Sequence, residues 1–310
     1  MYYLLYGFLY LISLIPFFIL YWLSDFICFC IYNLAGYRKK IILGNLSIAF
    51  PEKTEAEKKK IAKQFYKNFI DTFIESIKLL SMSDKTFRKR AVMDMTEINA
   101  VAAKGKSIQF HSGHQMNWEY GNYVMATKLP IPWIGVYMKI SNKALNRLFY
   151  NIRSKKGTVL VATREFKSRM HEVFRQQYSL GLAADQNPGE PHRSNWLYFF
   201  TKAAPFVTGP DKAAIKNDTA VIFVKFVKRK RGYYEFIAKV ITEEGSLLEP
   251  GELTLLYRDF LEETILESPD NYLWSHRRWK WLYEPHLEHL WIDKVPPPGG
   301  WTKKSIENAQ

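Results

Sequence analysis

Residues 107–121, SIQFHSGHQMNWEYG, place a cluster of polar side chains directly after a short apolar run. The run Ser107–Phe110 predicts a buried strand, and Glu119–Ala126 predicts the helix that follows it. In an α/β sheet, ligands bind beyond the carboxyl ends of the strands. The stretch therefore predicts a functional site at a strand end, with His114 in the connecting loop.

The same alternation of short apolar runs and helical stretches continues along the chain. It predicts an α/β fold with a mixed, largely parallel sheet flanked by helices. Further strands are expected at Trp133–Met138, Thr158–Val161, Leu180–Ala184, Ala220–Val227 and Tyr234–Ile241, with a basic hairpin turn at Lys228–Tyr233. Helices are expected at Lys143–Ser154, Glu165–Gln177, Pro210–Lys216 and Glu252–Ser268, and from the capping box of Thr54 and Glu57 to about Leu80.

Charge and composition restrict the partners of this 310-residue chain. It has 44 Lys and Arg against 30 Asp and Glu, a formal net charge of +14, and 16% aromatic residues. Such a protein usually meets an anionic partner, either nucleic acid or a membrane surface. No zinc-finger, KH or RNP pattern accompanies the charge, so no nucleic-acid partner is expected. The cysteines Cys28 and Cys30 both lie in the apolar N-terminal stretch, which excludes a disulfide framework for the remainder.

The N-terminal segment predicts a membrane anchor. The first 24 residues carry no charge, and Asp25 is the only charged residue before the basic cluster Arg38–Lys40. At about 1.5 Å per residue such a run can cross a hydrocarbon core of about 30 Å as a transmembrane helix. The basic cluster then predicts that the rest of the chain lies on the cytoplasmic side. Pro16 leaves a second possibility open, a kinked segment that lies in the membrane interface.

These features predict three parts of the chain. Residues 1–36 are expected to form the membrane anchor and residues 37–290 a single catalytic domain. The run VPPPGG and the polar residues after it predict a loose C-terminal tail at 291–310.

Two polar clusters follow predicted strands and could face one crevice. The first contains His114 and Glu119, and the second is Asp185-Gln186 after the run LGLAA. Within one helix, five positions correspond to about 500°, which leaves two side chains about 140° apart. His114 and Glu119 can therefore meet only if His114 precedes the helix and Glu119 lies in its first turn. A carboxylate on one imidazole nitrogen would make the other nitrogen a general base for a hydroxyl group.

Two other interpretations compete with this general-base dyad. His114 and Glu119 could be structural polar groups at a strand end. A zinc site that includes His111 is also conceivable, but the spacing of His111 and His114 is one residue short of a helical ligand pair, and no cysteine is nearby. No metal is therefore expected.

Several motifs, taken in order, resemble one enzyme family. GHQMNWE at 113–119 resembles the G-H-x-G-N-W-E signature of the lipid A biosynthesis acyltransferases, the late lauroyl and myristoyl transferases within the H-x4-D/E glycerolipid acyltransferase superfamily. The resemblance extends over roughly residues 1–290 and includes RKKIILGNLSIAFPEKT, LAADQNPGE, YFFTKAAPFVTGP and NYLWSHRRWK. Met116 and Thr201 stand where the family usually has glycine, so the substrate pocket is expected to differ in shape.

The resemblance implies a membrane-anchored O-acyltransferase that needs no cofactor. It would move a fatty acyl chain from an acyl carrier protein thioester to a hydroxyl of a lipid A precursor, without a covalent acyl-enzyme. His114 would be the base and Glu119 the carboxylate that orients it. Arg153 would bind the oxyanion or an acceptor phosphate, and Asp185 and Gln186 would border the substrate. Asp185 could equally hold Arg153 or cap the strand end.

Other basic residues are weaker candidates. Arg164 is a possible phosphate ligand, and His111 is expected to support the site from behind. The resemblance offers His276, Arg277 and Arg278 as possible lipid phosphate contacts, although they could instead hold the C-terminal part of the fold. The implied location is the cytoplasmic face of the inner membrane.

The acceptor and the reaction leave alternatives. The same residues would serve an acyltransferase for another glycolipid or a lysophospholipid, or a lipid or thioester hydrolase that activates water. A lipid-binding protein without catalysis is a third class.

Overall fold

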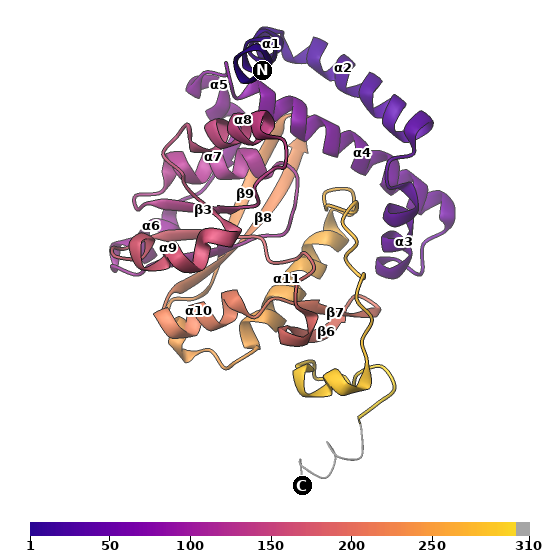
Figure 1. Cartoon of the computed structure of the whole chain (residues 1–310), viewed down its shortest axis with the longest axis vertical. Coiled ribbons are helices and arrows are strands. Elements are labelled where there is room, and N and C mark those ends of the chain that lie inside the picture. Colours follow the sequence, from indigo (N-terminus) through magenta and orange to yellow (C-terminus); the bar gives the residue numbers. More distant parts are fainter. Residues whose placement is uncertain (302–310) are drawn as a thin grey trace.

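The computed structural model describes residues 1–301, which fold around a seven-stranded sheet flanked by helices (Figure 1). The strand order is β1-β9-β8-β2-β5-β3-β4, and every neighbouring pair is parallel except β8 and β9. The mixed, largely parallel sheet predicted from the sequence is therefore confirmed. The strands are β1 (Ala91–Met93), β2 (Ile108–His111), β3 (Trp133–Tyr137), β4 (Val159–Ala162), β5 (Ser179–Leu182), β8 (Ala220–Lys230) and β9 (Tyr233–Thr242).

Every predicted strand is present, and the strands that the sequence did not indicate are short or lie outside this sheet. β1 has three residues, too few to show a periodic pattern. β6 (Asn195–Phe199) and β7 (Lys202–Phe206) form a separate antiparallel pair. The expected hairpin at 228–233 is confirmed, with Gly232 in the left-handed region at φ 75°.

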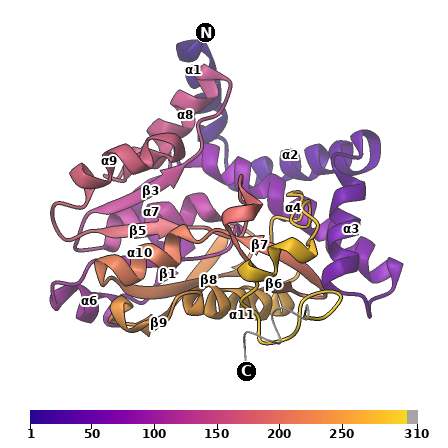
Figure 2. The same ribbon diagram turned by 60° about the horizontal axis from the view of Figure 1, so that its bottom comes forward.

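Helices cover both faces of the sheet, as Figure 2 shows. Along β8, Ile222, Val224 and Phe226 pack in the same core as α7 and α8, whereas Val221 and Phe223 pack in the core that contains α11. This alternation follows from the period of two along a strand. The helices after the N-terminal region are α5 (Asp84–Arg90), α6 (Thr96–Ala103), α7 (Trp118–Lys128), α8 (Lys143–Ser154), α9 (Phe166–Val173), α10 (Gly209–Asn217) and α11 (Glu252–Glu267).

The predicted helices differ from the observed ones mainly at their ends. α9 ends at Val173, earlier than expected, because Phe174 turns to stack on Tyr178 with ring centroids 4.1 Å apart. α7 begins one residue earlier than expected, after Asn117, whose side chain accepts from the backbone N–H groups of Glu119 and Tyr120.

The N-terminal region consists of two short helices on a long one. α1 (Tyr2–Leu14) and α2 (Phe17–Phe29) are separated at Ile15-Pro16, and a π-helical turn, Cys30–Ala35, continues α2. Proline interrupts the helix because it has no N–H to donate. Phe17–Ala35 is long and apolar enough to cross a membrane by length and composition. The expected apolar N-terminal helix is therefore present at Phe17–Ala35, and the break at Pro16 that the sequence left open separates it from α1.

α3 (Lys39–Ala49) and α4 (Glu55–Lys78) complete this region. The predicted capping box is present, since Thr54 and Glu57 each bond the other's backbone or side chain.

The C-terminal part is packed further than the sequence indicated. Trp291 pairs with Trp196 of β6 in a β-bridge, and Asp293 accepts from Arg258 Nη1 at 2.8 Å and from the Tyr198 amide at 3.0 Å. The expected loose tail at 291–310 therefore does not begin before Asp293, because these residues are tied to β6 and α11. Residues 302–310 lie outside the described part of the chain.

Candidate active site

The loop after β2 carries His114 to the carboxyl edge of the sheet. Gly113 permits this path, because a Cβ there would lie 2.8 Å from Leu261 Cδ2 of α11. Tyr257 donates from its hydroxyl to the Ser112 carbonyl at 2.7 Å and accepts from the Ala184 amide at 3.1 Å. One tyrosine thus links the loop after β2 to the loop after β5, the strand beside it in the sheet.

This link brings the two predicted polar clusters together. His114 Nδ1 lies 2.6 Å from Asp185 Oδ1, and the His114 backbone N–H donates to Asp185 Oδ2 at 3.0 Å. Asp185 is buried, with 1% of its side chain exposed. Since Asp185 holds Nδ1, the imidazole presents Nε2 as its free nitrogen.

The structure corrects the expected partner of Glu119. His114 lies in the loop and Glu119 in the first turn of α7, as the spacing required, yet among residues 1–301 the two side chains share no hydrogen bond or ion pair. Arg153 of α8 instead donates from Nε at 3.0 Å to both carboxylate oxygens of Glu119 and from Nη2 at 2.5 Å to Oε1. Glu119 points toward α8 because α8 packs beside α7. Asp185 therefore stands where the orienting carboxylate was expected.

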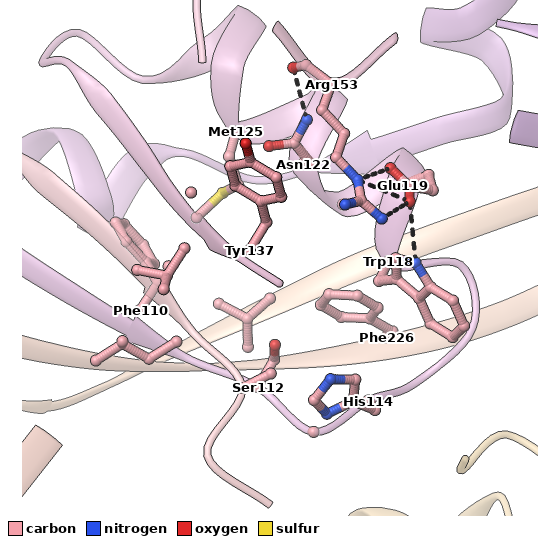
Figure 3. A pocket seen from close by; sticks show the side chains of 18 of the residues that line it. Phe110, Ser112, His114, Trp118, Glu119, Asn122, Met125, Tyr137, Arg153 and Phe226 are labelled. Atoms are coloured by element: carbon pink, nitrogen blue, oxygen red, sulfur yellow. Dashed lines mark hydrogen bonds and ion pairs between the residues drawn. The ribbon is translucent and has the colours of Figure 1, made fainter. Parts of the chain in front are cut away.

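A cavity of about 410 Å³ joins these groups (Figure 3). Figure 3 shows His114 on one side and the Glu119–Arg153 pair on another, with Trp118 and Phe226 near both. The volume is within the range of small-molecule sites. Most of the lining is apolar and comes from the sheet and α7: Phe110, Met125, Trp133, Val136, Tyr137, Leu160, Leu182, Val224, Phe226 and Phe236.

The electrostatics of His114 suit a general base. Burial lowers the pKa of His114, but the charge of Asp185 and its hydrogen bond outweigh burial, so the pKa is raised above its ordinary value. Burial likewise raises the pKa of Asp185, and the contacts with His114 reverse this and lower it. His114 is therefore a stronger base than a free imidazole, and because Asp185 holds Nδ1, it can accept a proton at Nε2.

Glu75 of α4 supports the site, and the sequence analysis did not identify it. Glu75 is fully buried and accepts from Asn117 Nδ2 at 2.8 Å, Tyr234 Oη at 2.8 Å and Tyr21 Oη at 3.0 Å. Asn117 is the residue that caps α7, so Glu75 fixes the start of the helix that carries Glu119. The available signal was a charged residue within the apolar stripe of α4, between Ile74 and Ile77.

Three other predicted residues, Gln186, Arg164 and His111, lie at different places relative to the cavity. Gln186 lines the cavity beside Asp185. Arg164 is exposed in a turn after β4 and is not a lining residue of that cavity. His111 is buried behind the site, 3.0 Å from Gln109, and burial lowers its pKa to about 3, which keeps it neutral.

The segment of His276, Arg277 and Arg278 packs on the loop after Asp185. The backbone N–H of Asn187 donates to His276 Nε2 at 3.0 Å, and burial lowers the pKa of His276 to about 4. Arg278 is 1% exposed, with its guanidinium 4.2 Å from the Phe206 ring centroid. The side chain of Arg278 is therefore enclosed in the core, which agrees with the alternative role of holding the C-terminal part of the fold, and a lipid phosphate contact of Arg278 stays a prediction. Arg277 is exposed.

Met116 and Thr201, which stand where the resembled family usually has glycine, do not line the cavity. Met116 is fully buried in the core, and Thr201 donates from its hydroxyl to the Ile48 carbonyl at 2.7 Å. Met116 therefore packs in the core and Thr201 bonds the end of α3.

Within residues 1–301, no group of three or more His, Cys, Asp or Glu side chains is placed to hold a metal ion.

The Glu119–Arg153 pair should contribute strongly to stability. Glu119 is 3% exposed, so removing its partner leaves a buried charge, at a cost of about 3 kcal/mol. We expect E119Q and R153Q each to lower the free energy of unfolding by about that amount in urea titrations. The double variant should lose clearly less than the sum.

The control for this prediction is K139Q, which removes the exposed pair of Lys139 and Glu165 and should change stability little. Additive losses in the double variant would show that the two side chains do not stabilise each other.

Comparisons with known proteins bear on this geometry. A sequence profile of the family described as bacterial lipid A biosynthesis acyltransferase matches residues 1–281. The chain is 25% identical over 250 residues to a lipid A biosynthesis lauroyltransferase of Escherichia coli K12, covering 78% of this chain and 79% of the relative. It is 21% identical over 246 residues, with the same coverage, to a lipid A biosynthesis palmitoleoyltransferase of Escherichia coli K12 and to a lipid A biosynthesis acyltransferase of Shigella flexneri.

Proposed function

Because the chain belongs to the family of bacterial lipid A biosynthesis acyltransferases, we propose that it transfers a fatty acyl chain from an acyl carrier protein thioester to a hydroxyl group of a lipid A precursor. The single observation that supports this most directly is the His114–Asp185 pair at the edge of an apolar cavity. It combines a fixed general base with room for a hydrocarbon chain.

In the proposed reaction, Nε2 of His114 accepts the proton of the acceptor hydroxyl as its oxygen attacks the thioester carbonyl carbon. Asp185 holds Nδ1–H and stabilises the imidazolium that forms. The tetrahedral intermediate then collapses, the carbon–sulfur bond breaks, and the proton passes from Nε2 to the departing thiolate. No side chain of the enzyme is acylated.

Arg153 is the proposed donor to the oxyanion. Its Nε and Nη2 are occupied by Glu119, while Nη1 has no hydrogen-bond partner among residues 1–301. Glu119 raises the pKa of Arg153 against the opposing effect of burial, so the guanidinium stays charged. A preorganised cation at the carbonyl oxygen stabilises the charge that develops in the transition state. Glu119 is then a residue that positions Arg153, and Gln186 borders the bound substrates.

The apolar part of the cavity is the proposed site of the acyl chain. Leu160 of β4 is 7% exposed and lines it. We expect L160F to shift the preferred acyl chain toward shorter donors, because each methylene that no longer fits loses about 0.8 kcal/mol, or about fourfold in kcat/KM. L160A should shift the preference toward longer donors.

The measurement compares kcat/KM across a series of saturated acyl-acyl carrier proteins. The matched control is V159F, at the exposed neighbouring position on β4, which should leave the preference unchanged. An equal loss at every chain length in L160F would contradict an acyl chain in this cavity.

The proposal also includes a docking site for the acyl carrier protein and a membrane anchor. Lys143 is exposed close in sequence to Met138 and Ile140, which line the cavity, so positive charge borders its mouth. An acidic carrier protein would dock there by charge complementarity. We assign residues 1–36 to a membrane anchor and residues 37–290 to the catalytic domain, on the cytoplasmic face of the inner membrane.

The test uses purified full-length protein in detergent with labelled acyl-acyl carrier protein and a tetra-acylated lipid A precursor. We expect a labelled lipid with one more acyl chain. Release of free fatty acid at the same rate without the lipid product would instead indicate a hydrolase. Transfer only to a lysophospholipid or another glycolipid would reject the proposed acceptor.

A further inference from the structure

α1 and α2 each present apolar side chains to the outside of the protein. Figure 1 shows the two helices together along the upper margin, and α2 packs on α4 while α1 packs on α4 and α8. On α2, Phe18, Trp22, Phe26 and Phe29 recur at helical spacing and are 57–70% exposed. The exposed apolar residues of α1 include Tyr3, Leu4, Phe8, Leu11 and Leu14.

The opposite face of α2 is buried against the catalytic domain. Leu20, Ser24 and Cys28 recur every four residues and are at most 5% exposed. Ser24 donates to Asp71 of α4 at 2.7 Å, and Tyr21 donates to Glu75 at 3.0 Å. α2 thus has two distinct faces: one is buried and hydrogen-bonded to the protein, and the other is apolar and exposed.

Charged contacts join the middle of this segment to the β8–β9 hairpin. Arg231 donates from Nη1 and Nη2 to Asp25 at 2.9 Å and from Nη2 to Asp71 at 2.7 Å. At the hairpin tip, Gly232 approaches α2 so closely that a Cβ would clash with the Tyr21 hydroxyl. Asp25 is the ninth of the 19 residues of Phe17–Ala35.

These contacts conflict with a helix that crosses the bilayer. If Phe17–Ala35 spanned the membrane, Asp25 would lie near the bilayer centre and would draw Arg231, Asp71 and the hairpin to that depth. Charged groups at the centre of a bilayer are strongly disfavoured. The other possibility, detachment of α2, would break the contacts of Asp25, Ser24 and Tyr21.

We propose that α1 and α2 lie in the plane of the membrane, with their exposed aromatic and aliphatic face in the interface of an anionic phospholipid bilayer and without crossing it. Helices with one apolar face and aromatic side chains bind membranes in this way. The inference rests on the proposed function, because it specifies how the anchor of that membrane enzyme is seated.

Charge complementarity favours an anionic bilayer as the occupant of this surface. Beside α1, the guanidinium of Arg147 lies 4.2 Å from the Tyr2 ring centroid, and Lys155 borders the same groove. Beyond the other end of the anchor, Arg38 and Lys40 are exposed. Cations at both ends of an apolar surface are placed for lipid phosphates at the level of the headgroups.

The first experiment determines on which side of the membrane the N-terminus lies. The full-length chain carries one epitope ahead of Met1 and another after Gln310, in sealed inverted inner-membrane vesicles that expose the catalytic domain. We expect an added protease to remove both epitopes without detergent. Protection of the N-terminal epitope until detergent is added would overturn the proposal. Acyl transfer measured on the same vesicles is a separate readout, so failure of the proposed function is distinguished from failure of the topology.

The second experiment measures binding of purified protein to vesicles. W22D/F26D places two charges on the exposed face of α2, and we expect it to reduce co-sedimentation with vesicles that contain anionic phosphatidylglycerol by at least tenfold. L247D changes an exposed leucine in a turn after β9 and should bind like the unaltered protein. Unchanged binding of W22D/F26D, with the fold verified by circular dichroism, would overturn the proposal, as would equal binding to neutral phosphatidylcholine vesicles.

Discussion

Replacement of His114 with alanine is expected to lower kcat for acyl transfer by a factor of about 10²–10⁴, the usual contribution of a general base. Among residues 1–301, His114 is the one side chain that combines a fixed nitrogen on a buried carboxylate with a free nitrogen beside the cavity. Without it, the acceptor hydroxyl must attack while still carrying its proton. KM for the acyl donor should change little, since the loss concerns the transition state.

The matched control for H114A is H171A, because His171 is exposed on α9 away from the cavity. H171A should unfold at the same urea concentration as the unaltered protein, whereas H114A, which leaves the buried Asp185 carboxylate without its imidazole partner, should unfold at a lower urea concentration but be fully folded under assay conditions. If H114A retained more than about a tenth of the activity, another group would have to be the base.

Replacement of Asp185 with asparagine is expected to be nearly as damaging, with a loss of about 10²–10⁴ in kcat. The asparagine amide can donate to Nδ1 and so place the proton of the imidazole on Nε2, where it blocks base catalysis. The variant also changes the pH dependence. Activity requires neutral His114, so it rises as the pH increases through the pKa of His114, which Asp185 raises. In D185N burial acts without this opposing charge, and the rise should move to lower pH with a lower plateau.

The comparison with E119Q decides which carboxylate orients the base. Glu119 contacts Arg153 rather than His114, so E119Q should lower the plateau but leave the pH of the rise unchanged. A pH shift in E119Q and none in D185N would restore the dyad that the sequence spacing suggested. The profiles are measured as kcat/KM for the acyl donor between about pH 5 and 9.

The described fold was predicted from the sequence where local patterns are strong. The apolar runs of β2, β3, β4, β5, β8 and β9 are each bounded by polar or turn residues, and a strand of this kind needs no distant information. The hairpin at Gly232 and the capping box of Thr54 and Glu57 are likewise set by residues close in sequence. β1 was missed because its three residues depend on pairing with the distant strand β9.

For the site, the sequence determined which residues lie at the strand ends. It placed His114 before a helix, Glu119 in its first turn, and Asp185 after another strand. The local geometry that would let Glu119 meet His114 is present, but Glu119 contacts Arg153, whose position the local sequence does not specify. Glu75 stayed hidden because its role depends on Asn117, Tyr234 and Tyr21, which come from three separate segments.

The sequence by itself therefore determined the class of fold, the polar groups at the sheet edge and the apolar N-terminus, since each follows from periodicity or composition over a few residues. Only the tertiary structure decided the pairing of His114 with Asp185 and of Glu119 with Arg153. Adjacent parallel strands β2 and β5 bring residues 71 positions apart into contact, and the packing of α8 on α7 turns Glu119 away. The same holds for α2, whose apolar sequence, charged only at Asp25, has the composition of a membrane span, while its contacts with Asp71 and Arg231 tie it to the side of the folded domain.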